Sequence, residues 1–206
     1  MIVGTYYFSQ SPKPQTIILS SVEIAKINYE QQKDLASLIA YGHALDTSML
    51  NMDSTRAYLQ SQFFKMLAKE AGNLYNIPQN ILYGLWMRES RMDPKAMGDM
   101  KFDSTGRVIP NSFRAFGLGQ IHLKTAQGHY DSGMTQARLM DPVENGFASA
   151  KILRDYADMF NGDFKYGISA YQQGPANTQS QWKRKQEPKN ISYVLDVLQN
   201  AAEIMH

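Results

Sequence analysis

The sequence predicts a mainly α-helical protein with a small β-hairpin near residues 100–110 and extra helices at its N-terminal end. Apolar residues recur at helical spacing over most of the chain beyond residue 20. The stretch from 98 to 115 is the least helical, and it holds a glycine where a hairpin turn needs one. Asp-Pro and Gly-Pro pairs separate the helical segments that follow. These three observations together define the predicted fold class.

Composition limits the classes of function. A chain of 206 residues with 43% hydrophobic residues is expected to form one globular domain, or one domain with an N-terminal extension. The net charge of +2 argues against a nucleic-acid binder. The absence of cysteine excludes disulfides and cysteine-bound zinc, and the four histidines lack metal-ligand spacing, so we expect no metal site. We find no signal peptide and no apolar run that could span a membrane.

The first part of the chain carries no residues that we can connect to chemistry. Residues 1–20 look irregular or short-stranded, with a candidate strand at Thr16–Leu19. A helical pattern then begins at Ser20 or Ser21 and continues to Tyr41. We expect residues 1–54 to form an extension that packs on, or docks beside, a domain of residues 55–206. Packing is favoured because the predicted helices are amphipathic.

Two helices are predicted next, and the second brings a carboxylate to a buried face. The first begins near Asp53 or Ser54 and ends near Tyr75, and the second begins at Pro78. Apolar residues follow one stripe of the second helix, and Glu89 continues this stripe just before Asp93-Pro94 ends the helix. The stripe consists of Ile81, Leu82, Leu85 and Trp86.

A buried carboxylate either pairs with a cation or has a raised pKa, because burial disfavours its charged form. A Glu89 that stays protonated near neutral pH can act as a general acid. The alternatives are a structural ion pair with Arg88 or Arg91, or simple exposure at the end of the helix.

Two further stretches bring amide side chains to places where backbone elements turn. In Gly117–Gln120 the glycines allow a close approach of the backbone, and Gln120 offers both donors and an acceptor. Near Gly174-Pro175 a predicted helix from Phe164 ends, leaving Tyr171 and Gln172 at its exit. Aromatic faces with amides suit the binding of sugar rings. An ordinary glycine turn and a plain helix end are the alternatives.

The remaining elements are three helices and a basic loop. A short helix is predicted from Leu123 to Tyr130, and a longer one begins with Asp141 as its cap. The basic residues between Gln179 and Asn190 could bind an anionic polymer, although a solvated loop is the favoured interpretation. Tyr193 lies on the apolar side of a last helix near 191–205.

Four motifs in order resemble the catalytic domain of the soluble lytic transglycosylase family, which has a lysozyme-like fold. The resemblance covers the chain from about Thr55 onward. The motifs are Glu89-Ser90 after an apolar helix, Gly117–Ile121, Asp141–Gly146, and Ala170–Pro175 followed by Tyr193–Val197.

The resemblance implies cleavage of the β-1,4 bond between N-acetylmuramic acid and N-acetylglucosamine in peptidoglycan, with formation of 1,6-anhydromuramic acid. Glu89 would be the single acid and base, and the implied reaction needs no metal or organic cofactor. The implied substrate-binding residues are Ser90, Gln120, Tyr171, Gln172 and Tyr193, with Ser90 holding Glu89 in place.

The sequence departs from the family pattern at three positions. Gly119 replaces a methionine and Gln172 replaces an asparagine. The family often has a serine nine positions after the glutamate, which helps to orient the N-acetyl group of the substrate; that position is Gly98 here. The candidates to replace this serine are Asp99, Asp103, Ser104 and Ser112.

Two other functions remain open from the sequence. One is a goose-type-like lysozyme that hydrolyses the same bond, with Asp99 or Asp103 as the second carboxylate. The other is a non-catalytic peptidoglycan-binding or virion structural module. The expected partners are peptidoglycan glycan strands, with virion or secretion-apparatus proteins docking on the N-terminal segment. A protein made in the cytoplasm that acts on the cell wall or periplasm suits a bacteriophage lysin (endolysin) or virion component.

Overall fold

The computed structural model describes residues 3–6, 15–18, 52–98, 100–101, 103–107, 109 and 114–203. The chain divides into two compact units, residues 1–63 and 64–206, which are described separately. In the first unit, β1 (Val3–Tyr6) pairs antiparallel with β2 (Gln15–Ile18), with Val3 opposite Ile18. The strand predicted at 16–19 is thus confirmed within one residue. The helix predicted from residue 20 or 21 to 41 lies outside the described residues.

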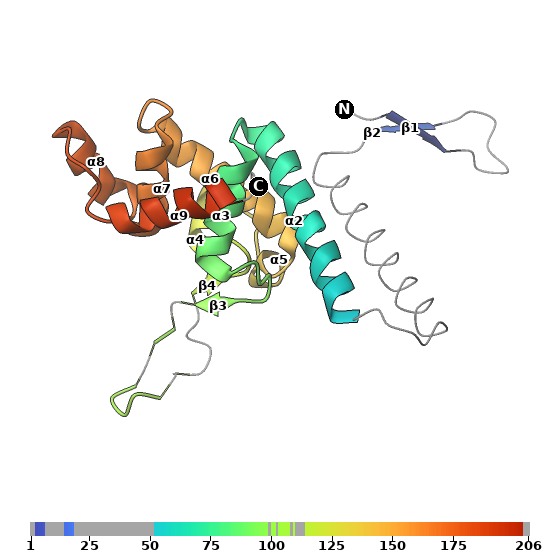
Figure 1. The fold of residues 1–206 in the computed structure, drawn as a ribbon, viewed down its shortest axis with the longest axis horizontal. Helices are drawn as coiled ribbons and strands as arrows, with labels where there is room; N and C mark the ends of the chain where they lie inside the picture. The colour runs from blue at the N-terminus through green and yellow to red at the C-terminus, as the bar shows by residue number, and fades with distance from the viewer. Residues whose placement is uncertain are drawn as a thin grey trace. The chain divides into compact units, whose positions relative to one another are not determined.

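The second unit is a helical domain with a small antiparallel sheet, which confirms the predicted fold class (Figure 1). Helix α2 begins in the first unit and continues into the second. The helices are α2 (Met52–Tyr75), α3 (Gln79–Ser90), α4 (Leu123–His129), α5 (Gln136–Leu139), α6 (Pro142–Asp158), α7 (Phe164–Gln173), α8 (Pro175–Lys183) and α9 (Ile191–Glu203). Helices α5 and α8 were not predicted; Pro175 suits the first position of α8 because its missing N–H would have no partner there.

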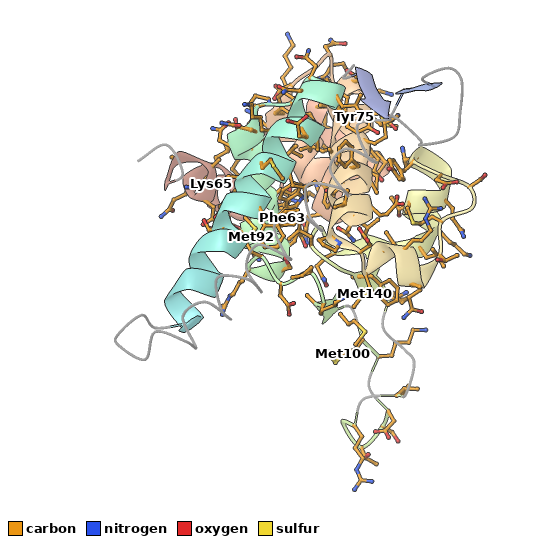
Figure 2. The ribbon with its side chains drawn as sticks, turned by 90° about the vertical axis from the view of Figure 1, so that its right-hand side faces the viewer. Phe63, Lys65, Tyr75, Met92, Met100 and Met140 are labelled. Carbon is orange, nitrogen blue, oxygen red and sulfur yellow. The ribbon has the colours of Figure 1, made fainter. Side chains whose placement is uncertain are left out.

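The sheet lies on either side of the segment in which the hairpin was predicted. Its strands, in the order β3-β4-β5, are β3 (Met97–Gly98), β4 (Ala115–Phe116) and β5 (Ile121–His122). Between β3 and β4 the N–H of Asp103 donates to the carbonyl of Arg107 at 2.8 Å, across a turn around Gly106. The described tip of this loop projects away from the helices, beyond Met100 (Figures 1 and 2). The N–H of Ile109 also donates to the carbonyl of Lys101 at 2.9 Å, so the described residues of this segment pair across the turn as the predicted hairpin requires. The three-stranded sheet, which was not predicted, flanks this hairpin.

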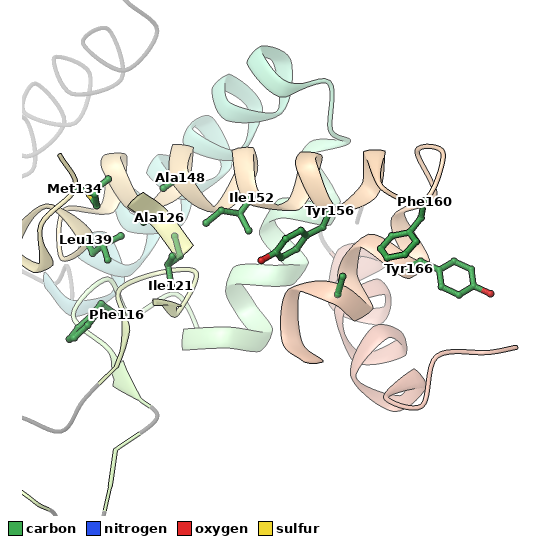
Figure 3. Close-up of a cluster of buried hydrophobic side chains, with 11 residues drawn as sticks. Phe116, Ile121, Ala126, Met134, Leu139, Ala148, Ile152, Tyr156, Phe160 and Tyr166 are labelled. Atoms are coloured by element: carbon green, nitrogen blue, oxygen red, sulfur yellow. The ribbon is translucent and has the colours of Figure 1, made fainter. Parts of the chain in front are cut away.

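Helix α6 runs through the core of the domain. The Asp141 carboxylate caps it by accepting hydrogen bonds from the N–H groups of Val143 and Glu144, at 2.8 and 3.0 Å, as predicted for this residue. Most of the helix is buried, including its polar Asn145 and Ser149. Ile152 and Tyr156 project from the same side of α6 into the main hydrophobic cluster (Figure 3). The helix thus places both apolar and hydrogen-bonding groups in the centre of the domain.

Helices α3 and α9 pack closely, and this packing positions the ends of both. Leu82, Leu85 and Trp86 have no exposed surface, which confirms three of the four residues of the predicted apolar stripe, whereas Ile81 is only partly buried. A Cβ added at Gly84 would lie 2.3 Å from the carbonyl oxygen of Val197, so only glycine allows α9 to approach this closely. Within the part of the chain that the structure describes, no helix is long and apolar enough to cross a membrane.

Candidate active site

Glu89 lies at the end of α3, and its carboxylate is mostly shielded from solvent. Burial raises the pKa of this carboxyl group above its ordinary value. A hydrogen bond donated by the hydroxyl group of Tyr193 and the positive charge of Arg88 both act to lower that pKa, but burial outweighs them. A glutamate whose protonated form persists to higher pH than usual can give up a proton to a bound molecule.

Arg88 is directed to a different carboxylate. Its Nε lies 3.1 Å from Oδ2 of Asp196, and its guanidinium carbon lies 5.3 Å from the centre of the Tyr193 ring. The structural ion pair of this region therefore joins Arg88 to Asp196, at the exposed surface. Arg88 acts on Glu89 through its positive charge. The hydrogen bond to the Glu89 carboxylate comes from the Tyr193 hydroxyl group.

A pocket of about 570 Å³ opens beside Glu89, within the size range of small-ligand sites. Elements α3, β4, β5, α4, α6 and α7 contribute to its walls, together with the turn between β4 and β5. Apolar, aromatic and amide side chains surround the single carboxylate, among them Gln120, Ile152, Tyr156, Tyr171 and Gln172. Among the described residues that line the pocket, Glu89 is the only carboxylate.

The turn that carries Gln120 is fixed from behind by Asn145 of α6. Asn145 is fully buried, and its Oδ1 accepts a hydrogen bond from the N–H of Gly119 at 2.7 Å. Its Nδ2 donates to the carbonyl groups of Phe116 and Leu139, both at 2.8 Å. Gln120 itself has a left-handed backbone, with φ of 49°. A buried amide thus bonds to the backbone on both sides of the turn and helps to fix its conformation.

Tyr171 and Gln172 are held by hydrogen bonds at the end of α7. The Tyr171 hydroxyl group donates to the carbonyl of Gly119 at 2.8 Å, which ties α7 to the Gln120 turn. Burial raises the pKa values of Tyr171 and Tyr193, and the nearby charge of Glu89 raises both further. Both hydroxyl groups thus stay protonated, so that Tyr193 donates to Glu89 while Tyr171 donates to Gly119. The Gln172 side chain accepts a hydrogen bond from Asn190 at 2.8 Å.

The structure brings most of the predicted site residues together. Glu89, Gln120, Tyr171 and Gln172 line one pocket, and Tyr193 reaches Glu89 through its hydroxyl group. The hydroxyl group of Ser90 donates to the Trp86 carbonyl at 3.2 Å, within the last turn of α3.

The residues considered as replacements for a serine at position 98 are placed differently. Asp99 and Ser112 lie outside the described residues. Asp103 and Ser104 are exposed on the loop between β3 and β4. The Asp103 carboxylate accepts hydrogen bonds from Thr105 and from the N–H of Arg107, and these bonds hold its pKa below the usual range.

Three residues that shape this site were not predicted to belong to it, although Ile152 and Tyr156 were predicted on the buried side of their helix. Ile152 and Tyr156 form a wall of the pocket, and Asn145 holds the Gln120 turn. Asn145 belongs to one of the quoted motifs, and a polar residue on the buried side of a helix could have flagged it. Within the described residues, no group of three or more histidine, aspartate or glutamate side chains is placed to hold a metal ion.

The helical domain, its small sheet and the glutamate at the pocket define a protein of the lysozyme-like class. A family model described as the transglycosylase SLT domain matches residues 66–194, which is more than half of the chain. The chain therefore belongs to the transglycosylase SLT domain family. The comparison with curated proteins finds no match.

Two solved structures are similar in fold. One is an inactive glutamate-to-glutamine mutant of the lytic transglycosylase Slt from Pseudomonas aeruginosa, with a TM-score of 0.51 and 18% identity over 66% of this chain. The other is the 70 kDa soluble lytic transglycosylase from Escherichia coli, with a TM-score of 0.56 and 19% identity over 88% of this chain. The matches cover 23% and 29% of those proteins, so the chain spans roughly a quarter of their length.

Proposed function

We propose that this chain is a peptidoglycan lytic transglycosylase that cleaves the β-1,4 bond between N-acetylmuramic acid and N-acetylglucosamine. The observation that carries the proposal is Glu89, a shielded carboxyl group with a raised pKa in a pocket lined by amides and aromatic rings. Membership of the SLT family supports the same reaction. The proposed site residues are Glu89 as acid and base, with Ser90, Gln120, Tyr171, Gln172 and Tyr193 around it.

In the first step, protonated Glu89 donates its proton to the oxygen of the glycosidic bond as that bond to the muramic C1 breaks. The N-acetyl group of the muramic residue assists this departure. The hydroxyl group of Tyr193 then stabilises the Glu89 carboxylate that is left, because it already donates to Oε1.

In the second step, the Glu89 carboxylate takes the proton from the 6-hydroxyl group of the same muramic residue. The oxygen of the 6-hydroxyl group bonds to C1 as the assisting N-acetyl oxygen leaves C1, and this closes the 1,6-anhydro ring. Glu89 begins and ends the cycle protonated, and no water is consumed. One carboxyl group is sufficient for both proton transfers, so the pocket needs no second carboxylate.

A hydrolase of this bond would use a second carboxylate, about 5–9.5 Å from the first. Asp103 is a poor candidate in this conformation, because it lies on the loop between β3 and β4, whose described tip projects from the helices (Figure 2). Its Oδ1 also accepts three hydrogen bonds from Thr105 and Arg107 of its own turn. The P. aeruginosa neighbour also supports a glutamate-dependent reaction, since that protein is described as inactive with glutamine in place of a glutamate.

The rest of the proposal concerns the setting of the domain. The catalytic domain would occupy residues 55–206 and act on glycan strands of the cell wall, while residues 1–54 form an extension. A phage lysin or virion component, or a part of a secretion apparatus, would provide that setting. In such an assembly, residues 1–54 would attach the catalytic domain to another protein.

The test is the loss of lytic activity in Glu89→Gln on purified peptidoglycan, followed by turbidity. Glutamine keeps the size of the side chain but cannot donate the proton, so we expect activity to fall by about a hundredfold or more. Glu187→Gln is the matched control, because Glu187 is exposed and forms a surface ion pair with Lys165. Unchanged lysis by Glu89→Gln would refute the role of Glu89, and lysis by neither protein would favour a binding module.

A further inference from the structure

Asn190 immediately precedes α9, and its side chain is bonded to α7. Its Oδ1 accepts a hydrogen bond from the Ser169 hydroxyl group at 2.7 Å, and its Nδ2 donates to the Ser169 carbonyl group at 3.2 Å. A carbonyl group only accepts hydrogen bonds, so Nδ2 must face it, and the Asn190 amide has one orientation. Two bonds to one residue thus fix both the place and the direction of this side chain.

Buried polar groups of α7 and α8 support this contact. Ser169 has no exposed surface, its Oγ accepts from Nε2 of Gln173 at 2.9 Å, and it lies 3.1 Å from Oγ1 of the buried Thr178. The backbone N–H of Lys189 donates to Oε1 of Gln181 at 2.9 Å, and Gln181 is also buried. Buried hydrogen bonds of this kind are costly to break, because a group left without a partner has no water to replace it. The residue before α9 is therefore firmly anchored to α7 and α8.

The first residue that this anchor holds is Gln172. The Asn190 Nδ2 also donates to Oε1 of Gln172 at 2.8 Å. Gln172 lines the pocket beside Glu89, and it is exposed. An exposed glutamine loses conformational entropy when a ligand orders it, and a side chain that is already held loses less. Asn190 thus prepares Gln172 for contact with a molecule in the pocket.

The second residue is Tyr193, the third residue of α9, whose hydroxyl group donates to Glu89. The first turn of a helix frays easily, because its N–H groups have no partners within the helix. The N–H of Val194 donates to the carbonyl group of Asn190 at 3.3 Å, so the first turn of α9 is built on Asn190. Further along, α9 is held against α3 at Val197. The turn that carries Tyr193 is therefore fixed at its start by Asn190.

We propose that Asn190 is a positioning residue that holds two parts of the site at once: Gln172 at the pocket and the turn of α9 that carries Tyr193. Asn190 is not among the described residues that line the pocket, so it acts through these two neighbours. The role of Gln172 as a contact of the glycan rests on the proposed function. The effect of Tyr193 on Glu89 does not depend on it.

The effect on Glu89 is specific, because several charged or titratable groups surround it and only one lies in the first turn of α9. Tyr193 and Arg88 both lower the pKa of Glu89, and Arg88 pairs with Asp196, which lies one turn further along α9. The other titratable groups at this pocket are Tyr171 of α7, Tyr156 of α6 and His122 of β5. Loosening the first turn of α9 should therefore change the contribution of Tyr193 first.

The test measures two properties of the whole chain that need no cleavage. One is the pKa of Glu89, followed by NMR of its labelled carboxyl carbon, and the other is the affinity for the soluble oligosaccharide chitohexaose, measured by calorimetry. Asn190→Leu keeps the size of the side chain but removes its hydrogen bonds. We expect a higher Glu89 pKa, because the Tyr193 bond that lowers this pKa is weakened. We expect the affinity to fall by about two- to tenfold, as for the loss of one hydrogen bond.

Two double variants separate positioning from a general loss of stability. In the Tyr193→Phe background, Asn190→Leu should leave the Glu89 pKa unchanged but still weaken binding. In the Gln172→Met background, it should leave the affinity unchanged but still raise the Glu89 pKa. Such selective non-additivity is expected of a residue that acts through these two partners, whereas a general loosening of the fold would affect both properties in both backgrounds.

Asn177→Leu is the matched control, because Asn177 is an exposed amide of α8 that donates to the Gln173 carbonyl group, next to Gln172, at 2.7 Å. It should change neither property. Ser169→Ala removes the hydroxyl group that donates to Asn190 but keeps the carbonyl bond, so it should produce both effects in weaker form. This variant provides the test if Asn190→Leu does not fold.

The proposal is overturned if the wild-type chain does not bind chitohexaose, or if Asn190→Leu and Ser169→Ala leave either property unchanged. Effects that persist in full in both double variants would also overturn it. If both effects are found while peptidoglycan stays intact, the positioning role of Asn190 stands and the proposed reaction fails. If the wild-type chain cleaves peptidoglycan but the variants change neither property, the reaction stands and the positioning role fails.

Discussion

The hydroxyl group of Tyr193 donates a hydrogen bond to the carboxylate of Glu89, across 104 positions of sequence. The two residues come from α9 and α3, whose close contact at Gly84 brings the ends of both helices together. This bond opposes the effect of burial on the Glu89 pKa. The contact thus controls both where the carboxyl group is and how readily it loses its proton.

Removing this bond should shift the pH dependence of activity. In Tyr193→Phe the pKa of Glu89 should rise further, because a bond that lowers it is lost. The proposed acid must be protonated, so activity is lost as the pH rises through the Glu89 pKa, and this limb should move to higher pH. The measurement is the pH profile of peptidoglycan cleavage. A limb that moves to lower pH would contradict this explanation.

The raised pKa of Glu89 should also cost stability near neutral pH. A carboxyl group with a higher pKa in the folded than in the unfolded state makes folding less favourable as the pH rises from its unfolded to its folded pKa. Glu89→Gln has no such group, so its melting temperature should exceed that of wild type at pH 7. The difference should be about 2–4 °C for each kcal/mol by which the free energy of unfolding increases. The difference should shrink at pH 4. An equal difference at both pH values would show that the pKa is not raised.

The contact between α3 and α9 should tolerate no side chain at Gly84. In Gly84→Ala the new Cβ would meet the Val197 carbonyl, and we expect a loss of about 1–3 kcal/mol of stability together with reduced activity. Gly128→Ala is the matched control, since a Cβ on that helical glycine meets no atom within 4 Å. Its stability should be unchanged or slightly increased. Thermal unfolding of both variants gives the comparison, and equal effects would exclude close packing as the cause.

Asn145 should be needed for both stability and activity. Asn145→Ala leaves buried polar groups of Gly119, Phe116 and Leu139 without their partner, at a cost of about 1–3 kcal/mol for each unpaired group that water cannot reach. The Gln120 turn should then loosen and cleavage should slow. Asn177→Ala, on the exposed side of α8, should change neither property. A stable and fully active Asn145→Ala would show that other contacts hold the turn.

The parts of the site that could be predicted are those that local periodicity determines. Glu89 was placed on a buried stripe because helical spacing shows which side chains share a face, and the structure confirms three of the four apolar residues of that stripe. The cap at Asp141 was predictable because it is local: the two N–H groups that it accepts from are two and three residues away.

The rest depends on contacts between distant segments or on very short elements. The partner of Glu89 is 104 positions away, and the orientations of Gln120 and Gln172 are set by backbone carbonyls and by Asn190. Strands of two residues are too short to show an alternating pattern, so the glycine signal revealed the turn around Gly106 but not the strands β3 and β4 on either side of it. No local rule reveals which end of an amide side chain faces a pocket.

The central claim is that one glutamate carries out the whole reaction without water, and the products of digestion test it most directly. The measurement is mass spectrometry of muropeptides released from purified peptidoglycan by the wild-type chain. Our proposal predicts fragments that lack one water and end in 1,6-anhydromuramic acid. Fragments with free reducing ends would contradict it, because water would then have attacked the bond with the help of a second carboxylate.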